Sequence, residues 1–195
     1  MAETAYSNAR RQGPLAGVAE PGGDALTLAH CPPRALLNLR CDASDARTVE
    51  ALGEALGAGL PRTANRSRSD AGVSVLWLGP DEWLVMAGDG AAGTIEARLR
   101  AAAGGDPWLA VVDLSHSYAG LRLHGAATRD VLAKGCPLDL HRSAFVAGDC
   151  AQTVLAGTRV LMCCRSDDDI ELWVRNSFAR HAAAWLADAM AEFLA

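Results

Sequence analysis

The chain has 195 residues, half of them hydrophobic, and a formal net charge of −5 at pH 7. This length fits one compact domain, or two small halves that share a core, and the hydrophobic fraction excludes a disordered protein. The small acidic excess, with no cluster among the 18 Lys and Arg residues, argues against nucleic acid as a partner.

The N-terminal residues and the cysteines together predict a cellular location. From Met1 to about Ala19 there is no apolar core of signal-peptide length, and no apolar run approaches the roughly 20 residues that cross a bilayer. We therefore expect no membrane contact and a cytoplasmic location with reduced cysteines. No CxxC pair and no zinc-finger spacing to histidine occur, so we interpret the cysteines as buried thiols. The six are Cys31, Cys41, Cys136, Cys150, Cys163 and Cys164.

Residues 1–34 are rich in Ala, Gly, Pro and Arg and show no clear hydrophobic period. Prolines such as Pro21 and Pro32 interrupt any regular element. We predict an extended arm, whose scattered apolar side chains could order it against a partner. Residues 35–195 form the predicted domain.

The domain is expected to begin with a strand at 35–41 and a helix that starts at Ser44 as the N-cap. Apolar residues recur at helical spacing until Gly57 or Gly59 can close the last turn. A polar loop at 62–70 follows.

The next segments alternate between strands and helices. Strands at 73–78 and 82–86, separated by Gly-Pro-Asp, are typical of a hairpin. A helix at 94–103 leads to a strand at 108–113, which is apolar on both faces and therefore expected in the centre of a sheet. A strand at 119–124 should then turn Leu121 and Leu123 inward. The helix that follows, at 126–134, would end at Gly135 in a left-handed conformation.

Three late strands, at 152–155, 159–164 and 170–175, precede a final helix with Ser177 as its cap. A helical stripe should face the core, formed by Phe178, Ala182, Trp185, Leu186, Ala189 and Phe193. Neighbouring strand pairs with single helices between them favour an α+β fold with largely antiparallel sheets over a doubly wound parallel sheet. No long internal repeat is evident, although strand–helix–strand units recur.

Residues 88–93 (GDGAAG) match the dinucleotide-binding pattern GxGxxG, with Asp113 about 20 residues further on. In that interpretation the backbone N–H groups would hold a pyrophosphate, and Asp113 would bind a ribose. The alternative is a flexible loop in a Gly-rich and Ala-rich chain. The following sequence looks antiparallel, which favours the loop.

Other candidate residues are better explained by structure than by chemistry. Asp113, Ser115 and His116 are the residue types of a hydrolase triad, but neighbours in an extended segment point to opposite sides, and no GxSxG elbow exists. We expect Asp113 and Ser115 to satisfy backbone donors at the strand end. Residues 134–136 (KGC) are similar to a motif of folate-binding proteins, although a helix end at Gly135 explains them too.

The remaining polar candidates do not converge in the sequence. The five histidines are scattered, and residues 167–169 (DDD) lack the other ligands of a calcium loop and indicate a solvated turn. We therefore predict no catalytic, cofactor-binding or metal-binding residue in this chain. Trp173 lies opposite the face shared by Ile170 and Leu172, so it is either an outward interface anchor beside Arg175 or part of a second buried face covered by a helix.

Several segments, in their combined order from about residue 36 to the end, resemble the gamma subunit family of heterotetrameric sarcosine oxidase. They are residues 78–85 (LGPDEWLV), 112–117 (VDLSHS), 121–125 (LRLHG), 132–140 (LAKGCPLDL) and 175–179 (RNSFA). The resemblance implies a shortened relative of the folate-binding fold of glycine-cleavage aminomethyltransferase.

The resemblance also implies a function at the level of an assembly. Alpha, beta, gamma and delta subunits together would demethylate sarcosine oxidatively to glycine, an oxidation of a CH–NH donor, and pass the one-carbon unit to tetrahydrofolate. FAD and FMN would lie at beta or its interface with alpha, NAD and tetrahydrofolate on alpha, and zinc on delta. Gamma would bind no cofactor and act as a non-catalytic subunit that packs against alpha.

Three alternatives stay open. The complex could oxidise another N-methylated amino acid, as an N-methylglutamate dehydrogenase does. The chain could instead be a stand-alone folate-binding one-carbon protein, because a shared fold alone does not decide function. A small dinucleotide-binding protein would use residues 88–93.

Overall fold

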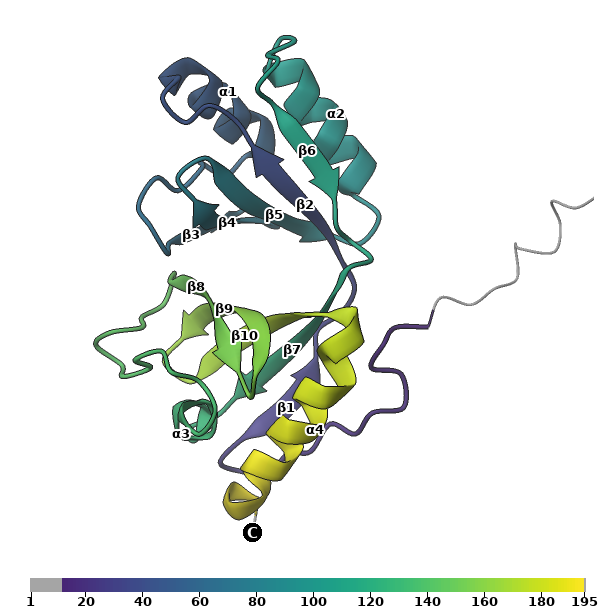
Figure 1. The fold of residues 1–195 in the computed structure, drawn as a ribbon, viewed down its shortest axis with the longest axis vertical. Coiled ribbons are helices and arrows are strands. Elements are labelled where there is room, and N and C mark those ends of the chain that lie inside the picture. Colours follow the sequence, from purple (N-terminus) through teal and green to yellow (C-terminus); the bar gives the residue numbers. More distant parts are fainter. Residues whose placement is uncertain (1–11, 195) are drawn as a thin grey trace, which may run out of the picture.

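The structure is a computed structural model that describes residues 12–194 (Figure 1). Two five-stranded sheets, in which every strand pair is antiparallel, confirm the predicted α+β class. The strands are β1 (Thr27–His30), β2 (Arg34–Arg40), β3 (Ser67–Asp70), β4 (Val73–Gly79), β5 (Glu82–Gly88), β6 (Ala110–Asp113), β7 (Tyr118–His124), β8 (Cys150–Leu155), β9 (Thr158–Ser166) and β10 (Asp169–Arg175). The helices are α1 (Ala46–Leu56), α2 (Ala92–Ala102), α3 (Thr128–Ala133) and α4 (Ala179–Met190), with short 3-10 turns at Asn176–Phe178 and Ala191–Phe193.

The elements form four layers. The first sheet has the order β3-β4-β5-β2-β6 and carries α1 and α2 on its outer face, while the second has the order β1-β7-β10-β9-β8 and carries α3 and α4 (Figure 1). The two sheets face each other across a third hydrophobic cluster. Its fully or nearly fully buried members are Leu36, Leu76, Leu84, Met86, Cys150, Leu161, Cys163 and Trp173.

Both sheets share one topology. The first is built as strand β2, helix α1, the strands β3 to β5, helix α2 and strand β6. The second follows the same course from β7 through α3, the strands β8 to β10 and α4, but its last position is occupied by β1 from the start of the chain. In the first sheet β5, α2 and β6 form a split βαβ unit around β2, whereas in the second sheet β1 takes the place of the strand that would follow α4. The sequence shows no long repeat because the similarity lies in strand order.

Residues 27–30, within the predicted arm 1–34, form strand β1 of the second sheet. β1 pairs with β7 in continuous register, and Leu26 and Leu28 are buried against the helices of the second sheet. Leu15 is buried in the same core. The segment from Leu15 onward therefore packs on its own domain and is not simply the extended arm expected from the sequence; residues 1–11 of that arm lie outside the described residues.

One strand prediction was wrong in its placement, and one predicted loop contains a strand. The strand predicted to be central, at 108–113, is β6 at the edge of the first sheet, where half of the Val112 surface is exposed and Trp108 precedes the strand at 74% exposure. The predicted polar loop at 62–70 ends in β3, which pairs with β4. Apolar composition cannot distinguish an edge strand from a central one, and polar strands at an edge look like loops.

The ends of the first helix follow local rules. Asp45, not Ser44, is the N-cap of α1, and its carboxylate accepts a hydrogen bond from the backbone N–H of Arg47 at 3.0 Å. Ser44 donates its hydroxyl to Asp42 instead. Gly57 ends the helix with φ 69°, as predicted.

The later helix ends differ from prediction. α3 ends at Ala133 without a left-handed residue, and Gly135 is required because an added Cβ would lie 2.5 Å from the ring of Trp185. Ser177 lies in a 3-10 turn and does not cap α4. The predicted stripe of the last helix packs inward at Ala182, Leu186 and Ala189, whereas Phe178 is half exposed.

Candidate functional site

The loop at residues 88–93 joins β5 to α2 but lacks the geometry of a dinucleotide site. β5 and β6 both pair with β2, which runs antiparallel between them, so no crevice opens between adjacent parallel strands. An added Cβ on Gly88 or Gly93 would meet no atom within 4 Å, so no close approach requires these glycines. Gly90, with φ 79°, serves the turn. Residues 88–93 are therefore a turn that leads into α2, although their sequence matches the dinucleotide-binding pattern.

Asp113 and Ser115 tie the end of β6 to β2. The Asp113 carboxylate accepts hydrogen bonds from the Ser115 backbone N–H at 2.8 Å and from its hydroxyl at 2.5 Å, and these two bonds lower the pKa of Asp113. The Ser115 hydroxyl oxygen in turn accepts from the backbone N–H of Leu36 at 3.0 Å. The predicted role at a strand end is confirmed, and the Ser115 hydroxyl donates to Asp113, not to His116.

The segment 134–136 connects α3 to the end of α4. The Lys134 ammonium donates to the carbonyl oxygen of Ala189 at 2.6 Å, forms an ion pair with Glu192, and lies 4.8 Å from the centre of the Phe193 ring. Cys136 is buried in the core of the second sheet. The tripeptide thus fastens the end of the last helix to α3.

The three aspartates at 167–169 contact arginines. Asp169 is buried at the start of β10 and binds Arg122 through two bonds of 2.7 and 2.5 Å, while Asp168 binds Arg142 at 2.6 Å. The segment is therefore less solvated than the predicted turn. Within residues 12–194, no group of three or more His, Cys, Asp and Glu side chains is arranged to hold a metal ion.

Trp173 is buried, so the prediction of an outward interface anchor was wrong and the second buried face is correct. Only 2% of the residue is exposed, and its ring lies between the two sheets. The indole N–H donates to the Glu171 carboxylate at 3.4 Å. The layer that covers this face is the other sheet, not a helix.

The thiols are shielded rather than activated. Burial raises the pKa of Cys31 to about 12 and those of Cys41 and Cys150 to about 11, and it raises the pKa of Cys163 well above its ordinary value. A thiolate is the reactive form of cysteine, so these four side chains are poor nucleophiles at neutral pH. The interpretation of the cysteines as buried thiols is confirmed for five of the six, whereas Cys31 is partly buried.

The tertiary structure gathers side chains of four strands around a groove of about 470 Å³ on the second sheet. Trp173 and Leu161, on the face turned toward the first sheet, form its apolar floor. Gln152 closes one side and donates its side-chain amide to the carbonyl oxygen of Leu78 at 3.0 Å, which links the two sheets.

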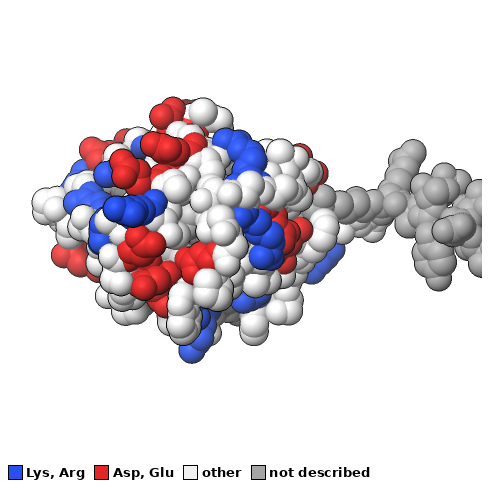
Figure 2. Space-filling view, turned by 90° about the horizontal axis from the view of Figure 1, so that it is seen from above, with Lys and Arg blue, Asp and Glu red and all other residues white. Residues whose placement is uncertain are grey.

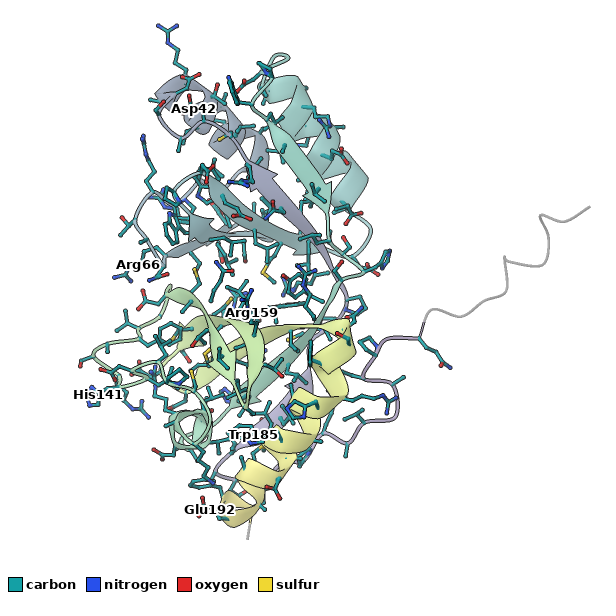
Figure 3. All side chains as sticks on the ribbon, in the orientation of Figure 1. Asp42, Arg66, His141, Arg159, Trp185 and Glu192 are labelled. Atoms are coloured by element: carbon teal, nitrogen blue, oxygen red, sulfur yellow. The ribbon has the colours of Figure 1, made fainter. Side chains whose placement is uncertain are left out.

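The rim of this groove is cationic. Arg159 and Arg175 are both exposed, and Figure 3 places Arg159 on the side of the second sheet that faces the first. The Arg175 guanidinium lies over the Tyr118 ring, 4.4 Å from its centre. No Asp or Glu is among the described residues that line the groove. Elsewhere, as on the face seen in Figure 2, basic and acidic side chains are interspersed.

Sequence reasoning noted Arg175 only as a neighbour of Trp173 and did not single out Arg159. Strand alternation could have predicted that Arg175 and Trp173 share one face of β10, and that Arg159 and Leu161 share one face of β9. The pairing of β9 with β10, which brings both faces together, is not encoded in either segment alone. No helix among residues 12–194 is long and apolar enough to span a bilayer.

Comparison of the fold with solved structures identifies the class of protein. The structure of glycine-cleavage aminomethyltransferase T from Bartonella henselae is similar at a TM-score of 0.59 and 20% identity, over 82% of this chain and 44% of that one. This likeness shows the fold alone. The sarcosine oxidase gamma subunit family model matches residues 40–192, and the chain belongs to this family.

Individual relatives agree with the family. The chain is 43% identical over 144 residues to the sarcosine oxidase subunit gamma of Corynebacterium sp. strain P-1, covering 73% of this chain and 70% of the relative. It is 42% identical over 144 residues to the corresponding subunit of Arthrobacter sp., with the same coverage. A chain in the structure of heterotetrameric sarcosine oxidase from Corynebacterium sp. U-96 aligns at a TM-score of 0.85 and 35% identity, over 95% of this chain and 97% of that chain.

Proposed function

We propose that this chain is the non-catalytic gamma subunit of a heterotetrameric sarcosine oxidase in the cytoplasm. The alignment with a chain of the Corynebacterium U-96 enzyme, which is nearly complete in both chains, supports this proposal most directly. The subunit would assemble with alpha, beta and delta subunits, with alpha as its direct neighbour.

The chemistry would take place on the other subunits. The assembled enzyme would demethylate sarcosine oxidatively to glycine and transfer the one-carbon unit to tetrahydrofolate, with FAD, FMN, NAD and zinc on the partners. The gamma subunit would contribute surfaces that bind the other subunits. Its own polar candidates support this role, because Ser115 and Lys134 make structural bonds and burial keeps Cys163 protonated.

Co-purification tests the proposal. The chain, tagged and expressed with the alpha, beta and delta subunits of its own organism, should be recovered in one complex that oxidises sarcosine, while the chain alone should be inactive. Assaying the complex with N-methylglutamate in parallel separates the two candidate substrates. Recovery of an active flavoenzyme that excludes this chain, or turnover by the pure chain, would contradict the proposal.

The likeness to aminomethyltransferase T favours one second candidate, a stand-alone folate-binding protein. Titration of the isolated full chain with tetrahydrofolate, followed by tryptophan fluorescence, distinguishes it. Trp173 lies in the groove of the second sheet, so a ligand there would change its emission. The subunit proposal expects no saturable change.

A further inference from the structure

Two arginines on neighbouring strands of the second sheet lie directly opposite each other. Val174 of β10 pairs with Val160 of β9, so the next position brings Arg175 beside Arg159. The same row continues outward to Val154 of β8 and, on the other side, to Tyr118 of β7. Like charges in directly opposite positions of an antiparallel pair are destabilising.

No carboxylate among the described residues relieves this repulsion, although the Tyr118 ring lies against the Arg175 guanidinium. Neither arginine has an ion pair within the described residues, and the groove beside them is lined without a carboxylate. Other exposed arginines do find carboxylates, as Arg142 does with Asp168 and Arg100 does with Glu96. Single arginines such as Arg98 also lack an ion pair among the described residues, so what distinguishes Arg159 and Arg175 is that two such guanidinium groups are neighbours.

The surroundings favour a polypeptide over a small anion. Val154 is 39% exposed beside the pair, on β8 at the edge of its sheet. Trp173 and Leu161 add an apolar floor. An extended segment with acidic side chains could neutralise both guanidinium groups and also cover the exposed Val154 side chain, which a free anion would leave open to solvent.

We propose that Arg159 and Arg175 bind carboxylate side chains of an extended acidic segment from a partner subunit, which lies in the groove along the row from Tyr118 to Val154. This inference rests on the proposed function, because it requires a complex. It adds the surface and the chemistry of the partner, which family membership does not specify. The planar guanidinium of Arg175, held over Tyr118, would be oriented before the partner arrives.

A cross-linking experiment uses an unusual feature of the sequence, in which Lys134 is the only lysine. Arg159→Lys and Arg175→Lys each place an amine in the groove, and a zero-length carbodiimide couples an amine to a carboxylate in contact with it. Applied to the purified complex, it should join the peptide carrying either substitution to an Asp or Glu of a partner subunit. Arg98→Lys on the exposed side of α2, where Arg98 has no carboxylate partner, is the matched control and should give no such product.

A second measurement separates a binding role from a structural one. The Arg159→Ala/Arg175→Ala variant should dissociate from the complex at least about tenfold faster than wild type and with a weaker dependence on salt. The melting temperature of the free variant chain should not fall, since repulsion is removed. Arg98→Ala should behave as wild type in both assays.

The outcomes distinguish the two proposals. If the wild-type chain does not co-purify with the other subunits, the proposed function fails. If the wild-type chain co-purifies but the groove amines give no cross-link to a partner, or link only to a second copy of this chain, the inference about the groove is overturned. Unchanged dissociation of the double alanine variant would overturn it as well.

Discussion

Because Gly120 of β7 has no side chain, Cys31 and the ring of Trp173 can pack directly against its backbone. An added Cβ at this position would lie 2.6 Å from Cβ of Cys31, 2.9 Å from the ring of Trp173 and 3.0 Å from the Cys31 sulfur. Carbon atoms in contact prefer about 3.5–4.0 Å, so Gly120→Ala forces a shift of roughly 1 Å. Cys31 cannot easily yield, because its backbone N–H donates to the carbonyl oxygen of Gly120 at 2.9 Å.

The magnitude follows from two opposing effects. Overpacking of a tight site costs about 1–3 kcal/mol, whereas replacing glycine by alanine gains about 0.4–1 kcal/mol from the unfolded chain. We expect Gly120→Ala to lower the free energy of unfolding by about 1–2 kcal/mol, a fall in Tm of roughly 2–8 °C for a chain of this size. Urea and thermal unfolding, followed by circular dichroism, measure both quantities.

The same substitution should have the opposite effect at Gly93. This residue lies in α2 with no atom within 4 Å of an added Cβ, so Gly93→Ala should stabilise the chain by about 0.5–1 kcal/mol. A double-mutant cycle with Cys31→Gly, which removes the nearest clashing atom, should recover part of the loss at Gly120. Equal effects of alanine at Gly120 and Gly93, or no coupling with Cys31, would refute the close-packing argument.

Three further perturbations test the interior. Arg129→Lys should lower the free energy of unfolding by at least about 2 kcal/mol, because Arg129 donates to the carbonyl oxygens of Asp167, Leu140 and Phe145 and lysine cannot satisfy all three; an unchanged urea midpoint would contradict this. The lowered pKa of Asp113 means that its stabilising contribution is present above about pH 4 and lost as the pH falls through that pKa, so Asp113→Asn should lose less stability than wild type between about pH 5 and pH 3 in urea titrations. At pH 8 a thiol with the pKa of Cys150, about 11, is ionised in roughly one molecule in a thousand, so iodoacetamide should modify it about a hundredfold more slowly in the native chain than in urea, and equal rates would show that it is not buried.

Local signals predicted most elements but not their neighbours. The hairpin of β4 and β5 could be predicted because a Gly-Pro-Asp turn and two apolar runs specify it within residues 73–88. The edge position of β6 could not, since an apolar run does not show whether a strand has a neighbour on one side or on both. Likewise, the alternation of β10 indicated two faces, but only the presence of a second sheet decided that Trp173 is buried.

The candidate site divides in the same way. Residue types and spacing were enough to argue that Asp113 and Ser115 end a strand, because that interaction spans two residues. The groove with Arg159 and Arg175 depends on the register between β9 and β10 and on the strands that flank them, so no local pattern contains it.

By itself, the sequence determined the α+β class, the strand–helix alternation and the resemblance to the sarcosine oxidase gamma subunit family, since all of these depend on short-range patterns. Only the tertiary structure decided that β1 completes the second sheet, that Trp173 is interior, and that two arginines meet at a groove without a carboxylate. The physical reason is that side-chain burial and charge pairing are set by which strands become neighbours, and those strands are brought together from distant parts of the chain.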